Sequence, residues 1–164
     1  MKFLEKDLEE IIYTADKAEL GKKGLDITGK IFRQLNIGNY GISDLIEVNR
    51  YGQTLCITIY ELKKEVVNVS TFLQAVRYAK GVSRYLTIRK PLMDIEIRIC
   101  LIGKKLDLQS SFSFLESIIP MELTEGRFLT IKTYDYSING ITFTDECDYW
   151  LVDEGFNLKP KCPF

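Results

Sequence analysis

Residues 53–63 of this chain, QTLCITIYELK, restrict its fold more than any other segment. Successive side chains of a strand point to opposite faces of a sheet. One face of this segment would carry Leu55, Ile57 and Ile59, and the other would carry Cys56, Thr58, Tyr60 and Leu62. A strand that is largely apolar on both faces is typical of the centre of a sheet covered on both sides. We therefore expect a central sheet with helices packed against it.

The segments before this strand predict its neighbours. Two strands, at 31–37 and 42–48, precede it, and the turn at 49–52 indicates an antiparallel meander. Apolar residues at helical spacing predict an amphipathic helix over 3–20. The central strand is therefore expected to lie beside the strand at 42–48.

Capping residues mark a second helix farther along the chain. Ser70 is a good N-cap and Gly81 a good C-terminal stop, which predicts a helix of about ten residues between them. Later segments predict a strand at 94–102, a helix at 108–119, and strands at 128–134 and 141–143, the second of which could run on to Trp150. This order favours one α/β (α+β mixed) domain over residues 1–164, with a central mixed β-sheet flanked by helices.

Residue types exclude several kinds of catalysis. The chain has no histidine, which excludes Ser-His-Asp and Cys-His catalysis and histidine zinc sites. The cysteines, Cys56, Cys100, Cys147 and Cys162, lack the short spacings of zinc and redox motifs, so we interpret them as small buried residues in a reducing compartment. Any catalysis must use carboxylates, lysine, tyrosine or a hard metal ion.

Charge is unevenly distributed, although the formal net charge is only −1. Residues 66–93 contain no Asp or Glu but carry Arg77, Lys80, Arg84, Arg89 and Lys90. Residues 133–158 contain acids but no Lys or Arg. A near-neutral total can hide a basic face that attracts phosphate, although two ordinary solvated faces would give the same pattern.

Hydropathy argues against a membrane protein. No apolar run approaches the roughly 20 residues needed to cross a bilayer. Acids interrupt the first segment, MKFLEKDLEEII, where a signal peptide would be apolar. We therefore expect no membrane association and a cytoplasmic location.

Two neighbouring strands bring acids and a lysine to one end of the predicted sheet. Asp44 falls on an apolar face, where a carboxylate requires a partner or a cation to remain charged. Glu61 and Lys63 share a face of the next strand, roughly 7 Å apart along it. Two carboxylates can hold magnesium, and a lysine can stabilise negative charge on a phosphate. A simple ion pair at the sheet edge is the alternative.

This constellation resembles the PD-(D/E)xK nuclease superfamily, and most closely its RecB-like branch of DNA-repair and defence nucleases. The matching segments are EKDLEEII at 5–12, GISDLI at 41–46, YELKK at 60–64 and QAVRY at 74–78, which fits the Q-x-x-x-Y element. The resemblance covers about residues 3–102 and is sharpest from 41 to 81. The remainder, 103–164, matches loosely and is expected to complete the sheet and its packing.

The resemblance implies a restriction-endonuclease-like fold and a site for Mg²⁺ or Mn²⁺. It implies that Asp44, Glu61 and the backbone carbonyl of Leu62 bind the metal and that Lys63 is catalytic. The expected nucleic-acid-binding residues are Gln74, Tyr78, Arg77, Lys80 and Arg84. The proline of the family's name is absent, since Ser43 precedes Asp44.

The family also carries an acid on its first helix, and Glu5 matches that place. At about 100° per residue, Glu5 lies at the border of the apolar arc, and Glu9 lies roughly 40° further out. We favour Glu5 as the acid that supports metal binding and catalysis, with Glu9 as the second choice. An exposed acid favoured by the helix dipole is the alternative.

The expected function is Mg²⁺-dependent hydrolysis of DNA phosphodiester bonds, and RNA is also compatible as a substrate. A catalytically inactive module that binds nucleic acid or regulates is the alternative, which the modest net charge favours. An unrelated α/β interaction domain would place Asp44 and Glu61 far apart. The small size is compatible with a homodimer or a partner subunit.

Overall fold

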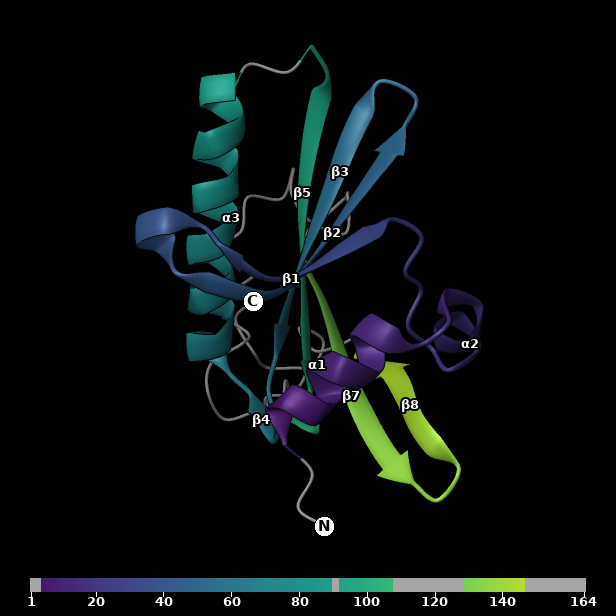
Figure 1. Cartoon of the computed structure of the whole chain (residues 1–164). Helices are drawn as coiled ribbons and strands as arrows, with labels where there is room; N and C mark the ends of the chain where they lie inside the picture. Colours follow the sequence, from purple (N-terminus) through teal and green to yellow (C-terminus); the bar gives the residue numbers. More distant parts are fainter. Residues whose placement is uncertain (1–3, 90–91, 108–128, 147–164) are drawn as a thin grey trace, which may run out of the picture.

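The computed structural model describes residues 4–89, 92–107 and 129–146, which form a six-stranded sheet with helices packed on it (Figure 1). The strands of the sheet are β1 (Lys30–Asn36), β2 (Ile42–Tyr51), β3 (Thr54–Leu62), β5 (Asp94–Gly103), β7 (Leu129–Ser137) and β8 (Gly140–Asp145), in the spatial order β1-β2-β3-β5-β7-β8. A separate parallel pair joins β4 (Val66–Val67) to β6 (Lys105–Leu106). The helices are α1 (Glu5–Thr14), α2 (Lys17–Lys22), α3 (Val69–Arg89) and the short 3-10 turn η1 (Gly38–Tyr40).

Strand pairing makes the sheet mixed. β1, β2 and β3 pair antiparallel, so the predicted meander is confirmed. β3 pairs parallel with β5, and β5 with β7, whereas β8 returns antiparallel to β7. Parallel neighbours need a crossover connection, and α3 lies in the connection between β3 and β5. The predicted class, a mixed α/β domain with one central mixed sheet, is confirmed.

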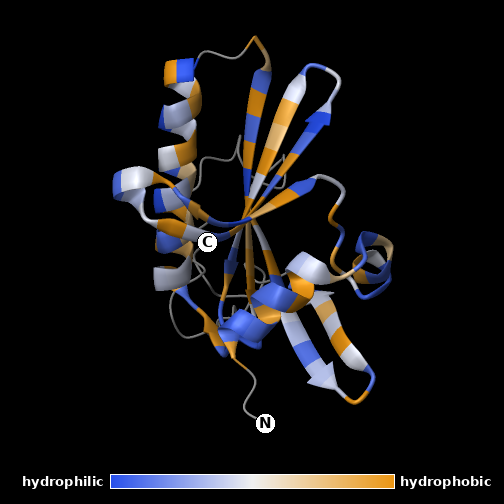
Figure 2. Ribbon diagram, in the orientation of Figure 1, coloured by the Kyte–Doolittle hydropathy of each residue, from blue (hydrophilic) through white to orange (hydrophobic). Residues whose placement is uncertain are grey.

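Two apolar layers enclose β3, as its two-sided sequence pattern predicts. On one face Ile59 packs in a cluster with Phe72 of α3, and on the other Leu62 packs with Ile12 of α1. Figure 2 shows hydrophobic and hydrophilic residues mixed along α1 and α3, as expected of amphipathic helices. Full burial of one such aliphatic side chain is worth about 1.5–3 kcal/mol, so these layers hold both helices on the sheet.

The single helix predicted over 3–20 is wrong, because α1 and α2 are separate. The chain is extended at Ala15 and Asp16, with ψ near 151° and 133°. The Asp16 carboxylate accepts hydrogen bonds from the N–H groups of Ala18 and Glu19, at 2.9 and 3.2 Å. An aspartate that caps a new helix competes with continuation of the old one, which explains the break.

The predicted limits of the second helix are also wrong, since α3 starts before Ser70 and continues through Gly81 to Arg89. Asn68 is the cap: its Oδ1 accepts from the Thr71 N–H at 3.0 Å, and the Thr71 hydroxyl accepts from the Asn68 N–H. Gly81 lies against η1, where an added Cβ would stand 2.7 Å from Tyr40 Cγ. Glycine at this position therefore permits close packing and does not end the helix.

The other strands agree with their predicted places to within a few residues at each end. The predicted helix at 108–119 lies outside the described residues. β8 continues past Phe143 to Asp145, and residues 147–150 of the expected extension towards Trp150 lie outside the described ranges. Cys56 and Cys100 are buried and not in a disulfide, as expected, whereas Cys147 and Cys162 fall outside the described ranges. Among the described helices, none is long and apolar enough to span a membrane.

Candidate active site

Asp44 extends the β2–β3 ladder with its side chain. Main-chain pairing between the strands ends at the pair Leu45–Tyr60. One residue further, Asp44 Oδ2 accepts a hydrogen bond of 2.8 Å from the Leu62 N–H. Burial raises the pKa of Asp44 to about 6, although this hydrogen bond and the charge of Lys63 both act to lower it. Asp44 is therefore a desolvated carboxylate tied to the backbone at the end of β3.

Glu61 is buried, yet only one of its carboxylate oxygens has a hydrogen-bond partner. Oε1 accepts from Lys63 Nζ at 2.7 Å, whereas Oε2 has no partner among the described residues. Burial, and next the negative charge of Asp44, raise the pKa of Glu61 to about 7. The two carboxylates are thus close enough to repel one another, contrary to the separation expected of an unrelated domain. A shared cation would relieve this repulsion.

Lys63 is the positive charge beside these acids. The main-chain N–H of Lys63 donates to the carbonyl of Ile102 at 2.7 Å, which fixes the chain where it leaves β3. Burial acts to lower the pKa of Lys63, but the hydrogen bond with Glu61 and the surrounding carboxylates outweigh it, so the pKa is raised. Lys63 is therefore protonated at neutral pH and acts as a hydrogen-bond donor.

Glu5 reaches the same end of the sheet from α1. Its Oε2 accepts a hydrogen bond of 3.3 Å from the Lys64 N–H, and its charge raises the pKa of both strand carboxylates. Glu9, one turn later, is buried and held by the side chains of Arg33 and Gln34. Both acids therefore lie near the strand end, but the oxygens of Glu9 already have donors.

Gln34 is a site neighbour that the sequence did not indicate. It is the one described non-glycine residue with positive φ, 50°, and the β1–β2 ladder skips it and its expected partner, Asp44. Opposed residues of antiparallel strands share a face, so a regular strand would place Gln34 beside Asp44. Its Nε2 instead donates to Glu9 of α1. Strained backbone of this kind often occurs at functional sites. In the sequence, only the weak strand pattern of residues 31–37 could have indicated that Gln34 is irregular.

Gln74 and Tyr78 form a pair on α3, with Nε2 donating to the tyrosine hydroxyl at 2.9 Å. Tyr78 is 3% exposed, and the guanidinium of Arg77 lies 5.5 Å from its ring centre. Tyr78 and Arg77 both face Gly41, where an added Cβ would stand 3.0 Å from Tyr78 Cε1 and 3.2 Å from an Arg77 guanidinium nitrogen. Within the described part of the chain, no hydrogen bond joins this pair to Asp44. Tyr78 therefore supports the start of β2 from the core, and Gln74 holds its hydroxyl.

The basic residues of α3 are separate from the acids. Arg77, Lys80 and Arg84 are all exposed. None of the three forms an ion pair within the described ranges. The structure thus brings Glu5, Asp44, Glu61 and Lys63 together and leaves these cations on the outer surface of α3.

The acids do not form a ready-made metal cage. Across residues 4–89, 92–107 and 129–146, no three Cys, Asp or Glu side chains form a group that could hold a metal ion. The predicted set relies on two strand carboxylates, Asp44 and Glu61, and on the main-chain carbonyl of Leu62. Mg²⁺ is usually bound by one or two carboxylates and keeps several waters, so this smaller set suits it.

The chain was also compared with known proteins. No protein-family model, curated protein or solved structure matches it.

Proposed function

We propose that this protein is a metal-dependent nuclease that hydrolyses phosphodiester bonds of DNA on a restriction-endonuclease-like core. One observation carries the proposal: the buried carboxylate of Glu61 has no hydrogen-bond partner for Oε2 among the described residues, and the charge of Asp44 acts on it. Such an oxygen is costly to bury unless a donor or a cation compensates it. A divalent cation shared by the two carboxylates removes that cost.

The oxygen atoms around Glu61 Oε2 are suitable ligands for a hard cation. Asp44, Glu61 and the carbonyl of Leu62 would hold Mg²⁺ or Mn²⁺, and Glu5 would support it from α1. All are oxygen ligands, which these ions prefer. When bound, the ion would polarise the phosphate and lower the pKa of a water molecule.

Lys63 gives the site a fixed positive charge. Its raised pKa makes it a donor rather than a general base at neutral pH. In the reaction, a water oxygen attacks phosphorus and loses a proton, while the bond from phosphorus to the leaving sugar oxygen breaks and that oxygen gains a proton. The ammonium of Lys63 stabilises the negative charge that develops on the phosphate oxygens.

The exposed cations of α3 suit the remainder of a polynucleotide. Arg77, Lys80 and Arg84 carry charges that no described carboxylate neutralises, in a helix without acids. Contacts of this kind bind phosphates regardless of base sequence. We therefore expect these residues to contribute affinity rather than sequence specificity.

A cleavage assay in Mg²⁺ and in Mn²⁺, on labelled DNA and RNA of the same sequence, tests the proposal. Glu61→Gln and Lys63→Met are each expected to reduce cleavage by about 100-fold or more, as when one group that stabilises the transition state is removed. Glu96→Gln is the matched control, because the carboxylate of Glu96 is bound by Arg98 on β5 at 2.7 Å. Wild-type rates in Glu61→Gln would overturn the mechanism.

A catalytically inactive module is the second candidate. It is favoured by the lack of three converging acidic side chains among the described residues. Such a module would bind nucleic acid without turnover in either metal, and Glu61→Gln would bind as the wild type does. If the wild type cleaves measurably and Glu61→Gln does not, the protein is a nuclease and the inactive module is excluded.

A further inference from the structure

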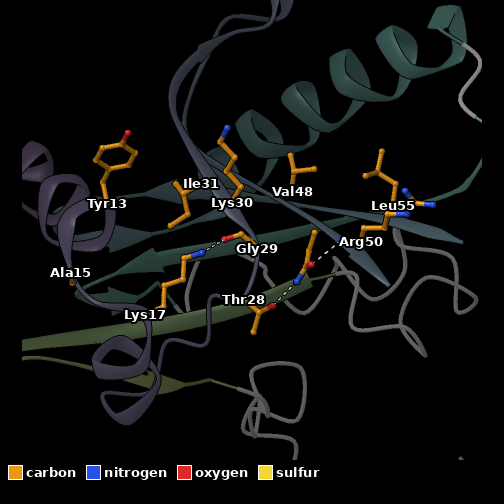
Figure 3. A pocket seen from close by; sticks show the side chains of 11 residues that line it. Tyr13, Ala15, Lys17, Thr28, Gly29, Lys30, Ile31, Val48, Arg50 and Leu55 are labelled. Atoms are coloured by element: carbon orange, nitrogen blue, oxygen red, sulfur yellow. Dashed lines mark hydrogen bonds between the residues drawn. The ribbon is translucent and has the colours of Figure 1, made fainter. Parts of the chain in front are cut away.

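A hollow of about 620 Å³ lies at the start of β1, where it meets the junction of α1 and α2 (Figure 3). Its walls include Tyr13, Lys17, Lys30, Ile31, Val48 and Arg50, and we call it the basic hollow. Arg50 lies six positions after Asp44 on β2, which at about 3.3 Å per residue is roughly 20 Å. The basic hollow is therefore separate from the carboxylates of the candidate active site.

Three cations and no carboxylate line the basic hollow. Lys17 Nζ and Arg50 Nε donate to main-chain carbonyl oxygens, and Lys30 Nζ lies 5.1 Å from the centre of the Phe32 ring. None of the three has an ion-pair partner in the described part of the chain. Six other described cations do: Lys22, Arg33, Lys63, Lys64, Arg98 and Lys132. The charge of the hollow is therefore available to a ligand.

The acids nearest in sequence do not neutralise this charge. Asp16 precedes Lys17, but its carboxylate caps α2. Glu47 precedes Val48, but it accepts hydrogen bonds from the N–H groups of Thr28 and Gly29 and from a tyrosine hydroxyl on β3. Both carboxylates are engaged with the fold, so an anionic ligand would not meet them.

The basic hollow also has an apolar part. Figure 3 shows Tyr13 at one end, Leu55 beside Arg50 at the other, and Ile31 and Val48 between the two ends. Tyr13 is 45% exposed, although it is large and aromatic, and the guanidinium of Arg33 lies 5.4 Å from its ring centre. A ligand that complements this surface needs negative charge for the cations and a flat apolar group for the ring.

We propose that the basic hollow binds a single-stranded segment of nucleic acid, with phosphates at Lys30 and Arg50 and a base stacked on Tyr13. The proposal rests on the proposed function and names its substrate class. A single strand offers both phosphates and free base faces, and surfaces that bind it combine a positive groove with aromatic rings. A duplex keeps its bases stacked inside and would leave Tyr13 unused.

Fluorescence anisotropy with a labelled single-stranded oligonucleotide in chelator, where no metal-dependent cleavage occurs, tests this inference. Lys30→Gln/Arg50→Gln is expected to weaken binding by about 25-fold at 0.1 M salt and to lower the salt slope by about 1.4, since each phosphate contact of a single strand contributes about 0.7. Lys22→Gln/Lys104→Gln removes the same charge from exposed positions outside the hollow and is expected to change binding less than twofold. Thermal melts of both double variants verify that they are folded.

The Tyr13 contact has its own test. Tyr13→Ala is expected to weaken single-strand binding by about fivefold or more, and Tyr13→Phe is expected to retain it, because stacking needs the ring and not the hydroxyl. The same-sequence duplex is expected to lose no affinity in Tyr13→Ala. Equal losses for duplex and single strand would overturn the single-strand assignment.

These results separate the inference from the nuclease proposal. Wild-type binding by Lys30→Gln/Arg50→Gln overturns the inference, even if the protein cuts DNA in Mg²⁺. Binding that depends on the hollow, without turnover in any divalent cation, retains the inference and removes the nuclease. Loss of self-association in the hollow variant, with unchanged oligonucleotide binding, would show that the surface joins two copies of the chain and would also overturn it.

Discussion

Glu47 and Glu61 are buried carboxylates on neighbouring strands, and the protein treats them in opposite ways. Glu47 Oε1 accepts from the N–H groups of Thr28 and Gly29, at 2.9 and 2.5 Å, and its Oε2 accepts from the Tyr60 hydroxyl at 2.7 Å. Each of its oxygens therefore has a donor. The carboxylate ties the loop before β1 to the centre of the sheet, which is a structural task.

Glu61 has the same chemistry and a different environment. Its Oε1 is bound by Lys63, but its Oε2 has no donor among the described residues, and Asp44 adds like charge. Burial is common to both glutamates, so burial alone does not indicate function. The missing donor is what supports the proposed metal site, because no described group compensates that oxygen.

Removing the two carboxylates in turn tests this difference directly. Glu47→Ala is expected to lower the free energy of unfolding by about 4 kcal/mol, because it leaves three donors without their acceptor, two of which, the Gly29 N–H and the Tyr60 hydroxyl, are buried. Glu61→Ala in chelator is expected to cost under about 1 kcal/mol, because the lost ion pair with Lys63 is offset by removing a buried oxygen without a described donor and a charge that Asp44 repels. Urea unfolding followed by circular dichroism measures both. Equal losses would mean that both carboxylates serve the fold.

Adding a divalent cation is expected to affect only the Glu61 end. At 100 times its dissociation constant, Mg²⁺ or Mn²⁺ raises the free energy of unfolding of the wild type by about 2.7 kcal/mol, through preferential binding to the folded state. Glu61→Gln is expected to lose this response, and the control Glu96→Gln to keep it. Thermal melts across a metal titration give the result, and a metal response in Glu61→Gln would place the ion elsewhere.

The pH dependence of stability provides a third test. The pKa of Glu61 is raised from 4.5 to about 7, so between these values the folded protein holds a proton that the unfolded chain has lost. The free energy of unfolding in chelator is therefore expected to fall by about 2 kcal/mol as the pH rises from about 4.5 to about 7. Asp44, raised to about 6, acts in the same direction. A slope in urea-unfolding data that survives in Glu61→Gln would contradict this assignment.

The smallest expected effect comes from a substitution that leaves one oxygen of Glu47 without its donor, as in Glu61. Tyr60→Phe removes the one donor to Glu47 Oε2 in the described part of the chain and is expected to cost about 1.5 kcal/mol, as for a lost hydrogen bond to a charged group. Tyr85→Phe is the control, because its side chain is 57% exposed, and a change within about 0.5 kcal/mol is expected there. Unfolding in urea distinguishes them, and no loss in Tyr60→Phe would mean that water replaces the hydroxyl.

Local sequence signals predicted the strands better than the helices. The apolar residues on both faces of residues 53–63 placed β3 correctly at the centre of the sheet, because the two-residue period lets each face be read from the segment itself. The helix signals failed where neighbours intervene. Gly81 suggested a helix end, but its missing side chain lets α3 approach Tyr40 of η1. Asp16 could be recognised as a cap in retrospect, since its carboxylate competes with the continuing helix.

By itself, the sequence determined that Asp44, Glu61 and Lys63 lie at one end of adjacent strands, because alternation and a short turn set the register of a hairpin. Only the tertiary structure decided that Glu5 arrives beside them, that Gln34 turns away, and that one oxygen of Glu61 has no described donor. The tertiary structure also brought the three cations of the basic hollow together from separate elements. These features depend on contacts between segments far apart in the chain, whose packing no local pattern encodes.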